Sequence, residues 1–416
     1  MTDFTVRTNL QTLRRIAVYK QRLFGIFPKI GKKDDILSTM KEIAYIQWDP
    51  ITIVAPSHLI SLWSRVGKFK LLDLEKLMWK DRRVFIHWTP VAMLVLTDDY
   101  PIFNSLMKRY PESLGGSWGS HIVRAKKFLS TNSDLRKKIV RELRGGPLRL
   151  DQLSDYAPSK RGPDGWSSDS IVSNMLHHLH LLGEVMVVGN ENNQKIWGLS
   201  EDFLPDGVDR TLLTREETDS AAAIRALKAI GPATKKEINY YFVRGRYYNL
   251  DQTISRLMDE GKVRPISVEG IQRKEERYII DDDVGLLDNS LLDDPEPRVS
   301  LLSPFDNLVF SRDRTRLVFG FDYIHEQFLP KEKRKYGTYV LPILWGEKII
   351  GRIDPKMDRL RNVLKINSVH AEPNEKVSRD VVEQIGERIS DLADFLGAEE
   401  IEYPGKLPPQ WKGRLS

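Results

Sequence analysis

An internal repeat constrains the fold of this chain more than any other feature of its sequence. The segments Ser133–Leu204 and Glu216–Val284 predict the same order of elements. Each begins with apolar residues at helical spacing, and this first helix ends at Gly145-Gly146-Pro147 in one copy and at Gly231-Pro232 in the other. Two further helices follow, and a glycine separates the last of them from two short strands. The repeat therefore predicts three helices and a β-hairpin, twice.

Three helices followed by a two-stranded wing are the plan of the winged-helix module, whose third helix usually enters the major groove of DNA. Winged helices also serve as protein-interaction modules, so the repeat alone leaves both partners open. A basic stretch favours double-stranded DNA, because nine Lys and Arg residues stand against two acidic ones between His121 and Leu150. Charge alone would fit a solvated helix face equally well. The candidate DNA contacts in this stretch are Arg124, Lys126, Lys127, Arg136, Lys137 and Arg149.

The two ends of the chain differ in character. The N-terminal part predicts three helices, near residues 13–23, 35–43 and 57–66. The C-terminal part predicts strands at 309–310, 317–321, 338–345, 348–353 and 363–366, followed by a helix over 378–396. Boundaries are expected near residues 129–132, 206–214 and 288–297, which divides the chain into three helical units and one β-rich unit.

The composition excludes several kinds of chemistry. The 416 residues contain no cysteine, which rules out disulfides, thiolate-bound zinc and a thiol nucleophile. The longest apolar stretches, such as 91–96, are too short to cross a bilayer, and the N-terminus lacks a signal-peptide pattern. We therefore expect a cytoplasmic, monomeric protein that does not bind membranes and needs no cofactor.

Three histidines, His177, His178 and His180, fall on the predicted third helix of the first repeat. These positions do not share one helix face, so the pattern does not favour a metal site. We expect them instead at a polar surface or in contact with DNA. Trp118 and the turn at 189–194 are further candidates for contact with a duplex.

The strongest candidate for chemistry is Gln47-Trp48-Asp49-Pro50. Pro50 favours an extended geometry at Asp49, which would turn Gln47 and Asp49 to the same side and Trp48 to the other. A carboxylate can stabilise a sugar cation and take a proton from water, while an amide orients that water, so the pair suits hydrolysis of an N-glycosidic bond. The bare triplet is common, and an aspartate before proline is usually an ordinary turn.

Two longer motifs give the pair its context. Ile46–Pro50 together with Ser57–Arg65 resembles the motif of the AlkZ/YcaQ-type winged-helix DNA glycosylases. The stretch Phe305–Arg314, continued by Phe319–Tyr323, is similar to the C-terminal region of that family, as are the later pairs Tyr336-Gly337, Leu341-Pro342 and Gly351-Arg352 with Asp354. The resemblance spans nearly the whole chain.

The resemblance implies an α+β fold of three tandem winged-helix units followed by a C-terminal β-barrel-like unit with a terminal helix. These units would occupy residues 1–130, 131–207, 208–290 and 291–416. It further implies removal of alkylated bases from duplex DNA, with Gln47 and Asp49 as the catalytic residues. Members with Gln-x-Asp resemble the branch that unhooks interstrand crosslinks. Pro56 and Ile86-His87 depart from the residues that are common in the family.

Some residues keep more than one interpretation. His58 and Arg65 are candidate DNA contacts, but each suits a structural role as well. For Arg312, Arg314, Arg352 and Arg359 we expect ion pairs with Asp306, Asp322, Asp354 or Asp358. The competing functions are a winged-helix DNA-binding regulator without activity and, with less support, a metal-dependent nuclease.

Overall fold

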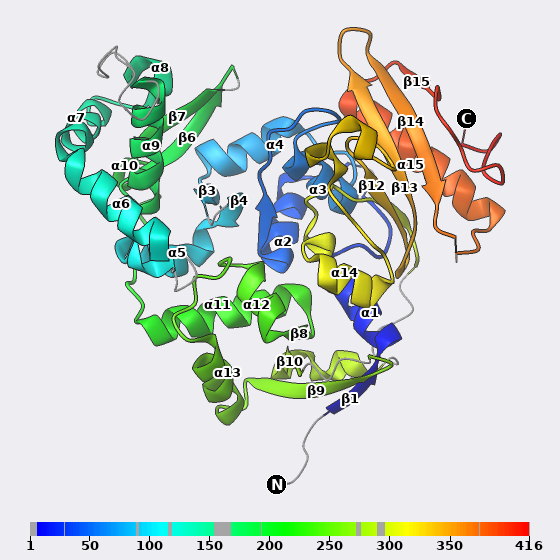
Figure 1. Cartoon of the computed structure of the whole chain (residues 1–416), viewed down its shortest axis with the longest axis horizontal. Helices are drawn as coiled ribbons and strands as arrows, with labels where there is room; N and C mark the ends of the chain where they lie inside the picture. Colours follow the sequence, from blue (N-terminus) through cyan, green and yellow to red (C-terminus); the bar gives the residue numbers. More distant parts are fainter. Residues whose placement is uncertain are drawn as a thin grey trace. The chain divides into compact units, whose positions relative to one another are not determined.

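The computed structural model describes residues 6–28, 30–88, 91–114, 119–153, 168–192, 194–271, 276–288, 296–373 and 375–415. The chain forms two compact units (Figure 1). The first contains Met1–Leu71, Ile224–Tyr241 and Arg256–Ser416, and the second contains Leu72–Ala223 and Phe242–Ser255. These units cross the boundaries expected after residues 130, 207 and 290, and the four-part division stays a prediction.

The first unit begins with a strand and three helices. Strand β1 (Val6–Asn9) leads into α1 (Leu10–Lys20), where the Asn9 side chain caps the helix by accepting from the Thr12 amide at 2.9 Å. Helices α2 (Lys33–Ile43) and α3 (Ser57–Val66) follow, with the short strand β2 (Tyr45–Gln47) between them. The three helices confirm the prediction from periodicity, because their apolar positions, such as Leu13, Ile36 and Ile60, are fully buried.

The later repeat supplies α11 (Arg215–Ile230), β8 (Ala233–Thr234), α12 (Lys235–Tyr241) and α13 (Leu250–Asp259). Strands β9 (Val263–Glu269) and β10 (Arg277–Ile280) form its antiparallel hairpin. The order of elements is the one predicted. Strand β1 pairs with β9 in parallel, Val6 opposite Ile266, so the sheet runs β1-β9-β10-β8. No local pattern in the sequence indicates this pairing between distant segments.

The second unit contains the earlier repeat. It runs through α7 (Ser133–Leu143), β5 (Leu148–Arg149), α8 (Leu150–Leu153), α9 (Ser168–Leu181), β6 (Val185–Glu191) and β7 (Gln194–Leu199), with sheet order β5-β7-β6. This again is the predicted order; that the two copies act as winged helices stays a prediction. The remaining elements of the unit are α4 (Leu71–Glu75), a π-helical turn (Lys76–Lys80), the antiparallel strands β3 (Val84–Trp88) and β4 (Ala92–Leu96), α5 (Tyr100–Lys108), α6 (Gly119–Thr131) and α10 (Ser200–Phe203).

The C-terminal part of the first unit is built on a five-stranded sheet. Its order is β11 (Val299–Leu301), β12 (Leu341–Trp345), β13 (Lys348–Asp358), β14 (Val363–Ala371) and β15 (Glu400–Glu402), and α15 (Arg379–Leu396) precedes the last strand. Among the described strands β11 and β15 are the two edges, so these pairings lend no support to a closed barrel. Helix α1 joins this part, because Ala17, Val18 and Leu23 share a core with Leu302 and Leu344.

Two predicted strands are wrong. Residues 317–321 belong to α14 (Arg312–Phe319) and the turn after it. The Ser311 hydroxyl caps this helix by accepting from the Arg314 amide, and Gly320 ends it in the left-handed conformation. A mostly apolar run of five residues can form either a strand or the end of a helix. Here the caps at Ser311 and Gly320 set the two ends of a helix. The predicted strand at 309–310 is also wrong, because Val309 belongs to a short 3-10 helix, Asn307–Val309, and Phe310 is its C-cap.

None of the helices in the described ranges is long and apolar enough to cross a membrane.

Candidate active site

The segment that carries Gln47 and Asp49 is held in place by two side chains from elsewhere in the first unit. The Asn307 amide donates to the Tyr45 carbonyl at 2.8 Å and to the Ile43 carbonyl at 3.2 Å, which fixes the start of β2. After β2, the Ser57 hydroxyl donates to the Gln47 carbonyl at 2.7 Å and accepts from the Asp49 amide at 3.1 Å. The Ser57 amide also donates to the Asp49 carbonyl at 3.1 Å. The loop is therefore rigidly tied to the first turn of α3.

Sequence reasoning missed Ser57 and Asn307 as positioning residues. The only clue for Ser57 was its place directly after Pro56, where a helix commonly begins with a hydroxyl side chain that bonds the backbone. Nothing near Asn307 in the sequence pointed to β2, because the two segments lie far apart along the chain.

The Asp49 carboxylate lies half-buried and has no cationic partner. Its Oδ1 accepts from the Ile51 amide at 3.0 Å, and no Lys, Arg or His of the described residues lies within ion-pair distance. Burial raises the pKa of Asp49 above the ordinary aspartate value, and the bond from Ile51 opposes that shift. The negative charge of Asp49 also helps burial to raise the pKa of the Tyr339 phenol. A carboxylate that is partly removed from water and left unpaired is suited to act as a base.

His58 does not have the properties of a phosphate contact. Its side chain is 9% exposed and packs against Trp48, with ring centroids 5.3 Å apart. Burial lowers the pKa of His58 to about 4, so the ring is neutral near pH 7. The Nδ1 atom has no hydrogen-bond partner among the described residues. These properties favour a structural role for His58, in which its neutral ring packs against the Trp48 side chain.

The prediction that Arg65 contacts DNA is wrong. Its side chain is wholly buried and forms a bidentate pair with Asp306, at 2.7 Å and 2.9 Å. The Gln21 amide oxygen accepts a further bond from the same guanidinium at 3.1 Å. A buried guanidinium with these partners cannot reach a phosphate, so Arg65 is a structural residue that joins α3 to the 303–310 segment.

Of the four arginines expected to form ion pairs with aspartates, only Arg314 and Arg352 form ion pairs among the described residues, and both bind glutamates instead. Arg314 pairs with Glu237 at 2.8 Å and shares that carboxylate with Arg277 at 2.7 Å. Arg352 pairs with Glu372 at 2.8 Å. Arg312 is exposed and has no ion-pair partner within the described ranges. The predicted Asp partners bind elsewhere: Asp306 to Arg65, Asp322 to Arg316, Asp354 to backbone amides and Asp358 to Lys365.

Arg359 holds the turn between β13 and β14 against the loop that follows Asp49. Its guanidinium donates to the Thr52 and Val54 carbonyls, both at 2.6 Å, and the Met357 amide donates to the Ile53 carbonyl at 2.9 Å. At the tip of this turn, Leu360 is 99% exposed. The candidate site thus has a fixed hairpin beside it, which ends in an apolar side chain open to solvent.

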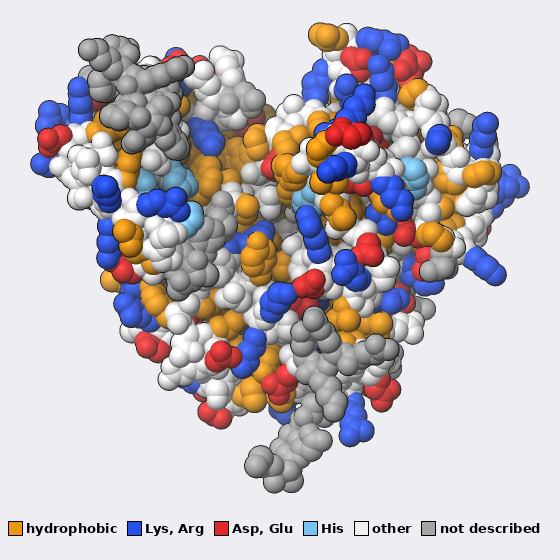
Figure 2. All heavy atoms as spheres, viewed as in Figure 1, with side chains coloured by type: hydrophobic (Ala, Val, Ile, Leu, Met, Phe, Trp, Pro, Cys, Tyr) orange, Lys and Arg blue, Asp and Glu red, His pale blue; other side chains and the backbone are white. Residues whose placement is uncertain are grey.

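The candidate DNA contacts of the basic stretch lie in the second unit. Arg124, Lys126 and Lys127 are exposed on α6, and Figure 2 shows Lys and Arg side chains along the edge that α6 and α7 form. Most of these cations have a nearby carboxylate: Lys126 has Glu112 at 2.6 Å, Arg136 has Glu184, Lys137 has Asp134 at 3.6 Å, and Arg149 has Glu191 at 2.7 Å. Gln47 and Asp49 belong to the first unit. Trp118 lies outside the described residues.

The histidines of α9 are not surface residues as expected. His178 and His180 are buried, and the Tyr110 hydroxyl bonds to His178 Nδ1 at 2.7 Å. His180 lies beside His87, with ring centroids 5.5 Å apart. His177 is only partly buried. Burial lowers the pKa of both His177 and His178, so their rings do not act as charged contacts near pH 7. Among the described residues, no group of three or more His, Asp or Glu is arranged to hold a metal ion.

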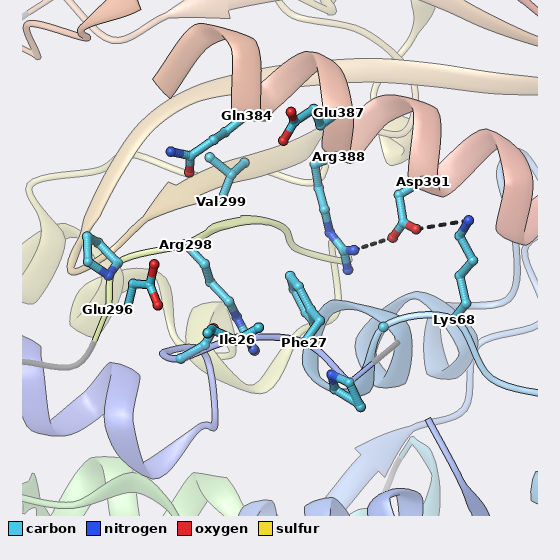
Figure 3. Close-up of a pocket in the computed structure, with 14 residues that line it drawn as sticks. Ile26, Phe27, Lys68, Glu296, Arg298, Val299, Gln384, Glu387, Arg388 and Asp391 are labelled. Atoms are coloured by element: carbon cyan, nitrogen blue, oxygen red, sulfur yellow. Dashed lines mark hydrogen bonds and ion pairs between the residues drawn. The ribbon is translucent and has the colours of Figure 1, made fainter. Parts of the chain in front are cut away.

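A cavity of about 470 Å³ lies in the first unit away from Gln47 and Asp49, neither of which lines it (Figure 3). Phe27 lies on its floor against two guanidinium groups, Arg298 at 3.9 Å and Arg388 at 3.8 Å from the ring centroid. Asp391 binds both Arg388 and Lys68. Arg298 donates to backbone carbonyls instead, among them those of Arg22 and Gly25. Gln47 and Asp49 are partly buried residues outside this cavity.

Replacing Ser57 by alanine is expected to lower the free energy of unfolding by about 1 kcal/mol, because a partly buried carbonyl and a partly buried amide lose their partner. Amide hydrogen exchange at Asp49 should become faster, since that amide bonds to the Ser57 hydroxyl. Chemical denaturation and exchange measurements test both effects. Ser173→Ala, at an exposed position of α9, is the control and should change neither. Unchanged exchange at Asp49 in the Ser57 variant would show that the hydroxyl does not hold the loop.

Comparison with known proteins connects this geometry to a family. The family model for AlkZ-like DNA glycosylases matches residues 40–395, a range that includes Gln47, Asp49 and most of α15. Among solved structures, the chain is similar to the Streptomyces sahachiroi DNA glycosylase AlkZ, with a TM-score of 0.66 and 14% identity over 97% of this chain and 100% of that chain. At this identity the structural likeness concerns the fold. The match of the family model to most of the sequence confirms the resemblance seen in the motifs. The chain therefore belongs to the AlkZ-like DNA glycosylase family.

Proposed function

We propose that this glycosylase hydrolyses the N-glycosidic bond of alkylated bases in duplex DNA, with Asp49 and Gln47 as the catalytic residues. The observation that carries the proposal is the half-buried Asp49 carboxylate, which has a raised pKa and no cationic partner within the described residues. The proposal extends to the unhooking of interstrand crosslinks that are attached through such a base, because the bond to be broken is the same.

In the proposed reaction, water attacks the C1′ atom of the sugar as the bond from C1′ to the base nitrogen breaks. The Asp49 carboxylate stabilises the positive charge that develops on the sugar, and it takes one proton from the water. Gln47 orients that water through its amide group. An alkylated base carries a positive charge, so it leaves with the electron pair of the broken bond and becomes neutral. It needs little help from an acid, which suits a site with two polar side chains.

The proposed DNA contacts come from both units. In the second unit they are Arg124, Lys126, Lys127, Arg136, Lys137 and Arg149, together with α9, the third helix of the earlier repeat. The third helix of the later repeat, α13, whose residues are divided between the two units, is a further proposed contact. Exposed ion pairs contribute only about 0–1 kcal/mol each, so these cations can exchange a carboxylate for a phosphate at low cost. In the first unit, the hairpin tip at Leu360 is a proposed contact, since an exposed apolar side chain between Arg359 and Arg361 can press against base steps.

The test is base release from duplex DNA that contains N7-alkylguanine, measured over a range of pH. We expect release by the purified protein, with a rate that falls as pH decreases through the pKa of Asp49, because only the ionised carboxylate acts as a base. Since burial raises this pKa, the fall should occur at a higher pH than for an ordinary aspartate. Base lost without protein is measured at each pH and subtracted.

Other outcomes would each replace the proposal with a different function. Duplex binding without base release at any pH would identify a non-catalytic DNA-binding protein. Strand cleavage that a chelator abolishes would identify a metal-dependent nuclease.

A further inference from the structure

A second surface of the first unit presents one exposed aromatic ring, Phe328, on two rings that are partly buried. Phe305, His325 and Phe328, which we name the aromatic shelf, lie in contact. The His325 ring centroid is 4.9 Å from that of Phe305 and 6.3 Å from that of Phe328, which is stacked on it. Phe328 is 66% exposed, and Ile324 beside the shelf is 50% exposed. Large rings this exposed on a folded surface call for a partner.

The segment that carries the shelf is fixed by hydrogen bonds. The buried carboxylate of Glu326 accepts from the amides of Tyr336 and Gly337, at 2.7 Å and 3.0 Å. The Arg334 guanidinium donates to the Leu329 carbonyl at 2.9 Å and to the Thr338 hydroxyl at 3.0 Å. These hydrogen bonds fix the backbone on both sides of Phe328. A ligand can therefore bind the ring without first ordering this segment.

Three cations without carboxylate partners lie close to the shelf, Arg312 through its effect on His325 and two lysines within five residues of Phe328 in the sequence. Arg312, Lys331 and Lys333 are exposed, and none has an ion-pair partner among the residues described. Arg312 is close enough to His325 to contribute, after burial, to a lowered pKa of about 4. His325 is thus neutral near pH 7, and it offers a ring face rather than a charge. The basic stretch on α6 and α7 differs in part, because Lys126, Arg136 and Lys137 each face a carboxylate.

One ring contact and two electrostatic interactions link the shelf with the candidate active site. The ring centroids of Tyr323 and His325 are 5.4 Å apart. Burial raises the pKa of the Tyr323 phenol, and the Tyr339 phenol adds to this shift. Tyr339 in turn lies in the field of the Asp49 carboxylate. The shelf and Asp49 are parts of the same compact unit.

We propose that the aromatic shelf binds unpaired bases of a DNA strand, with the phosphates of that strand on Arg312, Lys331 and Lys333. Exposed rings with cations beside them are the usual means of binding single-stranded nucleic acid, because every base has a face that can stack. Paired bases inside a duplex already stack on one another, so the shelf would act where a strand is opened. This inference rests on the proposed action on DNA and adds a second strand contact to it.

The test is equilibrium binding of a fluorescent thymidine oligonucleotide and of a fully paired duplex of the same length. Phe328→Ala is expected to weaken binding of the single strand about tenfold, because one stacking contact is lost. Phe328→Trp should restore it. Leu212→Ala, at another exposed apolar position, is the control and should have no effect. Duplex affinity should stay within about twofold in all three variants, because paired bases do not reach the shelf.

The phosphate part of the proposal has its own measurement. The Lys331→Gln/Lys333→Gln variant should reduce the slope of log K against log salt concentration for the single strand by about 1.4, which is about 0.7 for each phosphate contact. An unchanged slope would show that Lys331 and Lys333 do not contact the phosphates of the strand.

Several results would contradict the proposal that the shelf binds unpaired bases. Equal single-strand affinity of Phe328→Ala and the wild type is one, and an equal loss on single strand and duplex is another. A wild-type dimer that Phe328→Ala dissociates in sedimentation, with unchanged DNA affinity, would assign the shelf to contact between copies of the chain. The binding experiments do not depend on base release. If the shelf binds the single strand but the protein releases no base, the proposed glycosylase function is wrong and the shelf proposal still holds.

Discussion

Asp49→Asn is expected to lower the rate of base release by a factor of about 10²–10⁴, with duplex affinity unchanged. The amide has nearly the shape of the carboxylate, and its oxygen can still accept from the Ile51 amide, so the loop should keep its structure. The amide can neither take a proton from water nor balance positive charge on the sugar. Single-turnover release of N7-alkylguanine, together with binding to undamaged duplex, separates the chemical step from binding.

The matched control is Asp34→Asn, which removes a negative charge from an exposed position of α2 in the same unit. It should leave both the rate and the affinity unchanged. Equal rates for the wild type and Asp49→Asn would show that this carboxylate takes no part in the reaction. A parallel loss of binding and release would instead make Asp49 a DNA contact or a structural residue.

Asp306→Ala is expected to lower the free energy of unfolding of the first unit by about 3–5 kcal/mol, because it leaves the Arg65 guanidinium buried without its counter-charge. Both side chains are fully buried, so water cannot replace the lost partner. The substitution also removes the bond that Asp306 accepts from the Leu308 amide at 2.9 Å. Urea denaturation followed by tryptophan fluorescence measures the change, since Trp63 is buried in the same helix as Arg65.

Two further variants separate the pair from a general effect of mutation. The double variant Arg65→Met/Asp306→Leu should recover most of the lost stability, because no charge remains buried. Glu402→Ala, which breaks the pair with Arg361 near the surface, should cost less than about 1 kcal/mol. A loss for Asp306→Ala no larger than that for Glu402→Ala would mean that Arg65 reaches solvent or DNA.

Local patterns were sufficient to predict much of the fold. The helices α1, α2 and α3 and the order of elements in both repeats were predicted, because helical spacing and glycine stops involve residues only a few positions apart. The same locality explains the error at 317–321. There the helix α14 depends on a cap at Ser311 and a left-handed Gly320, and the short apolar run alone was ambiguous.

The choice of partners depended on segments distant in sequence. The charge pattern predicted that arginines in the C-terminal part would form ion pairs, but Arg314 found Glu237 and Asp306 found Arg65. In the same way, β1 pairs in parallel with β9, at the far end of the second repeat. Many carboxylates could satisfy a given guanidinium, and only the packing of the core selects one.

By itself, the sequence determined the element order of the repeats, the absence of cysteine chemistry, the family motifs and the choice of Gln47 and Asp49 as candidates. Only the tertiary structure decided which candidates lie where chemistry can occur. It buried Arg65 and His58, and it left Asp49 half-buried without a counter-ion. The physical reason is that the charge state and reach of a side chain depend on burial and on neighbouring charges, which long-range packing sets.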